Sequence, residues 1–137
     1  MVDPSVVTKR LGALEGYVDR LREFRTISRE QFIAEPDVHH LAERYLHLAC
    51  ECVLDIAQHV VSDAGFRQPE SYRDALAILD QEGILPTDLA ERLQRWMGFR
   101  NILVHLYLEV DHGIVYRAIR DQLEDLDQFA AAISRLI

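Results

Sequence analysis

Apolar residues recur every three or four positions along most of this chain of 137 residues, which is the spacing of amphipathic helices. No segment alternates apolar and polar residues with a period of two, and no Asn-Gly pair marks a hairpin between strands. The length suits one domain. The pattern therefore predicts an all-α bundle of five or six helices with short connections, in which residues 1–137 form a single domain.

Start and stop signals divide the chain into helical segments. Side chains that cap helices stand at the expected starts, and glycine or proline stands at most of the expected ends. The predicted segments are a helix over 5–25 with Ser5 as N-cap, a short helix after Ser28 that Glu35-Pro36 ends, a long helix over 37–64 ending at Ala64-Gly65, a loop at 67–70, a helix from Ser71 to Glu82-Gly83, a helix over 88–108 capped by Thr87 or Asp88, a turn at 111–113, and a last helical region broken near Asp121.

The helix over 88–108 departs from the two-sided pattern of a surface helix. Its first half has one apolar side and one charged side. Beyond Trp96 the outer side also becomes apolar, because Phe99, Ile102 and Leu106 occupy it. A helix that is apolar nearly all round is buried on both sides, so this half should contact more than the core of its own bundle.

Polar residues interrupt this apolar segment at positions that suggest function. Arg100 lies on the core side one turn after Trp96, Asn101 and His105 share a flank, and Tyr107 falls two turns after Arg100 on the same line. A guanidinium among apolar side chains costs free energy unless it binds an anion or lines a wet cleft. The segment is therefore predicted to form a functional site.

Composition narrows the choice of partners. The formal net charge is −8, which argues against broad attraction to nucleic acid but allows a small cleft with a few arginines. No apolar run approaches the roughly 20 residues of a membrane span, and the N-terminus lacks the pattern of a signal peptide. We expect a cytoplasmic protein with no membrane contact.

Cysteine and histidine positions do not favour a metal site. Cys50 and Cys52 lie on different sides of one helix, so they do not converge on one ion, although His47 is one turn away. They are interpreted as reduced core cysteines. His39 and His40 lack suitably spaced ligand partners and are interpreted as solvated or capping residues. No metal or other cofactor is expected.

A second polar pair lies on the long helix. Asp55 and His59 are four residues apart and should form a local contact. The structural interpretation is a simple pair; the functional alternative is that both line the same cleft as Arg100 and His105.

The motif residues suit one kind of chemistry. Histidine titrates near neutrality and serves as a general acid or base, and arginine stabilises a phosphorane without a metal. Arg100 and His105 together suit metal-independent cleavage of a phosphodiester, although the spacing alone is a weak motif.

The sequence resembles the HepT family of HEPN-domain ribonuclease toxins. Their motif of Arg, a polar residue, three further positions, His, any residue and Tyr matches Arg100, Asn101, His105 and Tyr107 without departure. The matching stretches are Gly98-Phe-Arg-Asn-Ile-Leu-Val-His-Leu-Tyr107, Leu54-Asp-Ile-Ala57, Ser71-Tyr-Arg-Asp-Ala-Leu76 and Gly83-Ile-Leu-Pro86.

The resemblance implies a helical homodimer whose two motif helices meet at a cleft. Phe99, Ile102 and Leu106 would then pack at the dimer interface. It implies metal-independent cleavage of RNA, not DNA, in which His105 handles the 2′-hydroxyl proton, Arg100 holds the scissile phosphate, and Asn101 orients one of them.

The same resemblance implies a protein partner. HepT toxins pair with MntA, a minimal nucleotidyltransferase antitoxin, in a type VII-like toxin–antitoxin system. MntA silences its toxin by transferring AMP from ATP to the motif tyrosine, which is Tyr107 here. If Tyr107 lies on the Arg100 line, the added phosphate would sit beside the guanidinium and block the cleft.

Two alternatives remain open from the sequence. The protein could be a non-catalytic subunit that binds nucleotide or substrate for a nucleotidyltransferase. It could also be a plain structural dimer in which a buried carboxylate such as Asp55 neutralises Arg100.

Overall fold

The computed structural model describes residues 2–137, and every regular element within them is a helix, which confirms the predicted all-α class. These residues form seven α-helices, one more than the upper predicted number, and the last helical region divides after Asp121, where a break was predicted. Their bounds, with two short 3-10 helices, are α1 (Pro4–Glu23), η1 (Phe24–Thr26), α2 (Arg29–Ala34), α3 (Pro36–Asp63), α4 (Tyr72–Gln81), α5 (Thr87–His105), η2 (Tyr107–Glu109), α6 (His112–Asp121) and α7 (Glu124–Ser134).

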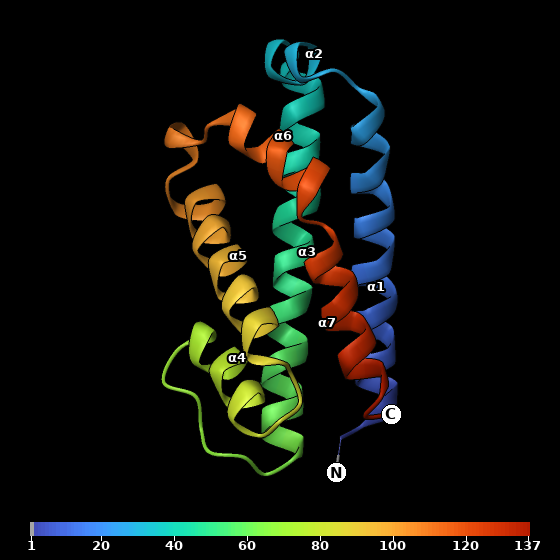
Figure 1. Cartoon of the computed structure of the whole chain (residues 1–137), viewed down its shortest axis with the longest axis vertical. Coiled ribbons are helices and arrows are strands. Elements are labelled where there is room, and N and C mark those ends of the chain that lie inside the picture. The colour runs from blue at the N-terminus through green and yellow to red at the C-terminus, as the bar shows by residue number, and fades with distance from the viewer. Residues whose placement is uncertain (1) are drawn as a thin grey trace.

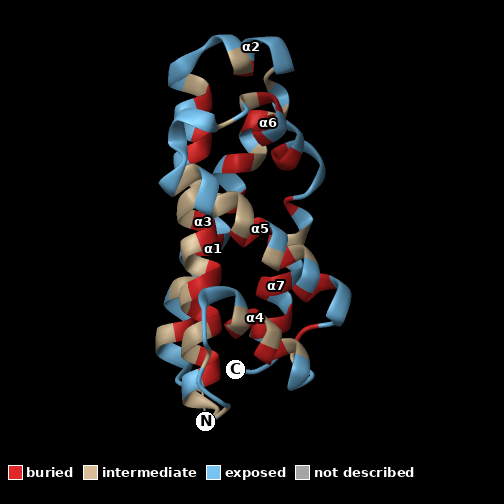
Figure 2. Ribbon diagram, turned by 90° about the vertical axis from the view of Figure 1, so that its left-hand side faces the viewer, coloured by how far each residue is buried: buried red, intermediate tan, exposed pale blue. Residues whose placement is uncertain are grey.

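Helix α3 is the centre of the bundle and runs along its whole length (Figure 1). Helix α1 lies along one side of α3. Helix α5 packs on α3 and α4, and α7 packs on α1 and α5. Helix α4 covers one end of the bundle, and α2 with α6 covers the other. Figure 2 shows the buried residues on the inward sides of these helices. The buried apolar side chains of all seven helices form one cluster. The broad apolar stripe of α3 predicted this central position.

Local capping explains where several helices begin. Ser28 accepts a hydrogen bond from the Gln31 amide, as predicted, and Ser71 does the same for the Asp74 amide. At α1 the prediction was wrong: the N-cap is Asp3, whose carboxylate accepts from the backbone amide of Ser5. A carboxylate two residues earlier is the stronger partner for the positive end of the helix.

Two other predicted helix boundaries are corrected. Pro86 is the N-cap of α5, and the Thr87 hydroxyl instead donates to Asp80 Oδ1 at 2.8 Å. Residues 111–113 were predicted to form a turn, but they begin α6. Asp111 is the N-cap and accepts from the Gly113 and Ile114 amides.

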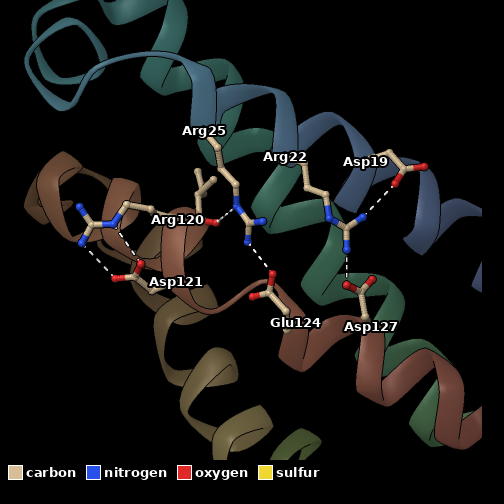
Figure 3. A network of polar contacts seen from close by, with 8 residues as sticks. Asp19, Arg22, Arg25, Arg120, Asp121, Glu124 and Asp127 are labelled. Carbon is tan, nitrogen blue, oxygen red and sulfur yellow. Dashed lines mark hydrogen bonds and ion pairs between the residues drawn. The ribbon is translucent and has the colours of Figure 1, made fainter.

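Ion pairs fasten α7 to α1 and to η1 (Figure 3). Arg22 bonds Asp127, and Arg25 donates both to Glu124 Oε1 and to the carbonyl oxygen of Ile119, each at 2.9 Å. Within residues 2–137, no helix combines the length and apolar character needed to cross a membrane.

The connection between α3 and α4 is an ordered loop, as predicted for 67–70. Both terminal nitrogens of Arg67 donate to the Asp74 carboxylate, at 2.7 and 2.8 Å, and the Glu70 amide donates to the same group. Gly65 allows the chain to leave α3 because its φ is +73°. The loop is therefore held in one shape by Asp74.

Asp74 should make the stability of the fold depend on acidic pH. The Arg67 hydrogen bond, followed by the Glu70 amide, lowers the pKa of Asp74 from 3.8 to about 2. A depressed pKa contributes stability that is complete above pH 4 and is lost as the pH falls through about 2. Asp74→Asn should thus melt at a lower temperature than the native chain at neutral pH, and this difference should shrink between pH 4 and pH 2 in thermal scans. A difference that stays constant over that interval would contradict the assignment.

Candidate active site

Arg100 is held between α5 and α3 by a carboxylate. Its Nε donates to Glu51 Oε1 at 2.5 Å, and its Nη1 donates to Asn101 Oδ1 at 2.9 Å. The side chain of Arg100 is only 14% exposed. Within residues 2–137, Nη2 has no hydrogen-bond acceptor, so one edge of the guanidinium stays available for an anion.

The sequence analysis missed Glu51. The carboxylate suggested for Arg100 was Asp55, but Asp55 bonds Arg10 of α1 and lies 3.5 Å from His59 Nε2. The local Asp55–His59 contact is as predicted. Glu51 could have been noticed as a charged residue in a largely apolar stretch of the long helix, one turn before Asp55.

A polar row on α3 continues from Glu51. His47 Nε2 lies 3.3 Å from Glu51 Oε1, and His47 Nδ1 lies 3.1 Å from Arg44 Nη1. Burial lowers the pKa of His47, Glu51 opposes that effect, and Arg44 and Arg100 add to it. A neutral His47 that accepts from Arg44 carries its proton on Nε2, facing Glu51. Arg44, His47 and Glu51 therefore form one connected row that leads to Arg100.

His105 is the last residue of α5 and is exposed. Its imidazole makes no hydrogen bond or ion pair to residues 2–137. The five residues between Arg100 and His105 correspond to a rise of roughly 7.5 Å along the helix. The same five residues turn the helix by roughly 140°, so the two side chains leave α5 on different sides.

Tyr107 does not lie on the Arg100 line, so that prediction was wrong. The helix ends at His105, because Leu106 has φ −123° and ψ +41°, and Tyr107 begins the 3-10 turn η2. Tyr107 is 69% exposed. It lines a hollow of about 320 Å³ together with His40, Glu43, Arg44, His47, Leu103 and Val110. The tyrosine thus faces the cationic end of the polar row on α3.

The apolar outer side of α5 is not buried within one chain. Among the residues of α5, those buried extend only from Leu89 to Met97. Ile102 is 37% exposed, Leu106 is 49% exposed, and Phe99 is half-buried. The second burial predicted for this side therefore requires a surface outside the described chain.

Cys50, Cys52 and His39 of α3 have structural roles. Cys50 is buried, and burial raises its pKa to about 12; half-buried Cys52 also has a raised pKa. His39 is not solvated as predicted: it is buried, its Nδ1 lies 2.9 Å from the Phe32 carbonyl, and its ring stacks on His112 at 3.6 Å. In the described part of the chain, no three histidine, cysteine or acidic side chains are arranged to hold a metal ion.

Comparison with known proteins now decides the family. The model of a family described as ribonuclease HepT-like matches residues 14–133. This chain belongs to the HepT-like ribonuclease family. The match covers the polar row on α3, the whole of α5 and the η2 turn, so the HepT-like motif residues lie inside it.

Relatives named as nucleases resemble this HepT-like protein in sequence, and a solved toxin structure resembles it in fold. The mRNA nuclease HepT of Shewanella oneidensis is 35% identical over 88 residues, which are 64% of this chain and 66% of the relative. The tRNA nuclease HepT of Aphanizomenon flos-aquae is 27% identical over 97% of this chain and 90% of its own length. A solved structure of a tri-AMPylated Shewanella oneidensis HEPN toxin in complex with MNT antitoxin is 27% identical, with a TM-score of 0.88 over 98% of this chain and 99% of that one.

Proposed function

We propose that this protein is an RNA endonuclease toxin that cleaves without a metal ion, with Arg100 and His105 as its catalytic residues. The observation that carries the proposal is the geometry of the two side chains. Glu51 fixes Arg100 with a free Nη2 edge, and His105 stands exposed five residues further along the same helix. Relatives named as mRNA and tRNA nucleases support RNA as the substrate class.

The reaction that suits these groups is an internal transesterification. His105 removes the proton of a ribose 2′-hydroxyl, and the 2′-oxygen attacks the adjacent phosphorus. The bond from phosphorus to the 5′-oxygen breaks, that oxygen takes up a proton from water, and His105 returns the proton it removed to solvent. The products are a 2′,3′-cyclic phosphate and a 5′-hydroxyl. Arg100 holds the phosphate and offsets the charge that develops on its oxygens, while Asn101 orients Arg100.

We place a homodimer contact on the outer side of α5. Phe99, Ile102 and Leu106 expose apolar surface beside the site, and covering it with a second copy would bring the two motif helices together. A composite cleft of this kind brings four cationic or titratable motif side chains to one RNA, which compensates for the net charge of −8. Asp55 retains a supporting role, because it lines the same hollow as Glu51, and His59 would act only through its contact with Asp55.

Glu51 should act as a positioning residue for Arg100. Glu51→Ala is expected to lower kcat roughly 10-fold, because the guanidinium loses the acceptor that fixes its Nε. Glu51→Gln keeps an acceptor oxygen and should recover most of that loss. Asp55→Asn is the matched comparison, since its carboxylate contacts Arg10 instead, and its effect on kcat should be smaller. Equal losses in Glu51→Ala and Asp55→Asn would contradict the positioning role.

We further propose that a nucleotidyltransferase of the MntA type silences the toxin at Tyr107. The Tyr107 oxygen would attack the α-phosphate of ATP, lose its proton and release pyrophosphate, leaving O-AMP-tyrosine. Arg44 lines the hollow beside Tyr107 together with the neutral His47, so the new phosphate would have one cationic neighbour. The tri-AMPylated relative in complex with its antitoxin supports this form of control. The site of action would be the cytoplasm, where RNA and ATP are both present.

Cleavage of RNA by the purified, unmodified protein in EDTA tests the proposed function. We expect cleavage to survive chelation and to leave cyclic phosphate ends. No cleavage by protein whose mass shows no adenylate would instead favour the non-catalytic, nucleotide-binding subunit.

A further inference from the structure

A large cavity lies next to the site but has no part in the chemistry proposed so far. It has a volume of about 730 Å³ and lies between the end of α3 and the loop that precedes α4. That volume is within the range of pockets that bind small organic groups. Its lining includes Gln58, Ser62, Phe66, Gln68, Ser71 and Tyr72.

Tyr72 joins this cavity to Arg100. Tyr72 is the first residue of α4, is 57% exposed, and has its ring centre 6.0 Å from the Arg100 guanidinium carbon. Tyr72 and Gln58 also line the neighbouring hollow that contains Glu51. A ligand held at Arg100 can therefore continue past the Tyr72 ring into the cavity.

The cavity is suited to a neutral, planar group. Its arginine, Arg67, is already bonded through both terminal nitrogens to Asp74, and Glu70 adds negative charge to the lining. These groups disfavour a phosphate. The amides of Gln58 and Gln68 offer both donors and acceptors, and Tyr72 offers an aromatic face. Proteins recognise unpaired nucleobases by this combination of stacking and hydrogen bonds to base edges.

We propose that this cavity binds one unpaired base of the RNA, adjacent to the phosphate at Arg100, with the Tyr72 ring as the stacking surface. The inference rests on the proposed function, since the RNA is positioned by Arg100. The loop is ordered before RNA arrives, because Ser71 caps α4 and Asp74 holds Arg67. Tyr72 and the two glutamines would thereby determine where along a strand the protein cleaves.

An abasic scan tests this subsite. The probe is a short single-stranded RNA with all four bases that the protein cleaves at one bond, together with variants that each lack one base. For the native chain, we expect removal of one base near the cleaved bond to lower kcat/KM roughly 10-fold. In Tyr72→Ala this specific penalty should disappear, whereas Tyr72→Phe, which keeps the ring, should retain it. Gln68→Ala should keep the penalty but change which base is preferred there.

Each other outcome has a defined meaning. If Tyr72→Ala slows every oligonucleotide equally and the abasic penalty persists, the ring only supports Arg100 and the subsite is refuted. If the native chain cleaves but no abasic position matters, the subsite is also refuted while the proposed function stands. If the native chain cleaves no RNA, the proposed function fails, and the subsite fails with it.

Discussion

Replacing His105 with alanine is expected to reduce RNA cleavage by roughly 10²- to 10⁴-fold, the usual contribution of a general base. His105 is exposed at the end of α5, and its side chain makes no hydrogen bond or ion pair to residues 2–137, so its removal should leave the fold unchanged. Rates would be measured in EDTA with unmodified protein, and circular dichroism and thermal scans would verify equal helicity and stability.

Arg100→Ala is the companion variant, with an expected loss of roughly 10²- to 10³-fold in kcat. It differs from His105→Ala in one respect: it leaves the half-exposed Glu51 without its arginine. Because His47 still faces Glu51, the cost to stability should be small. A variant that cleaves RNA at the native rate would show that the replaced residue takes no part in the reaction.

Replacing Tyr107 with phenylalanine is expected to abolish neutralisation by the antitoxin while leaving cleavage intact. The phenol oxygen is the atom that receives AMP, and phenylalanine lacks it. Tyr107 is largely exposed on η2, away from the core, so the ring can keep its place in the hollow beside Arg44. In cells, the variant toxin should remain lethal when the antitoxin is co-expressed.

The modification would be followed by the mass of the intact protein after incubation with antitoxin and ATP. Tyr72→Phe is a matched control, because Tyr72 is also an exposed tyrosine near the motif and should not change the adenylate signal. Adenylate that still appears on Tyr107→Phe would show that another residue is the acceptor. Neutralisation without any adenylate would indicate that the antitoxin acts by covering the site.

The sequence by itself determined the helical class, most helix boundaries and the motif residues. These features depend on signals that act over a few residues. Ser28 and Ser71 cap the helices that follow them, Glu35-Pro36 separates α2 from α3, and the central position of α3 follows from its broad apolar stripe. Arg100 was recognised because a charged residue on an apolar side is costly unless it has a partner.

Only the tertiary structure decided which partner each polar residue has. Glu51 and Asp55 are one turn apart on α3, yet Glu51 meets Arg100 of α5 and Asp55 meets Arg10 of α1. That choice depends on how far each helix is rotated and shifted against its neighbours, which no local signal encodes. The end of α5 at His105 likewise moved Tyr107 off the Arg100 line and into a hollow beside Arg44, because a single non-helical residue redirects the chain that follows it.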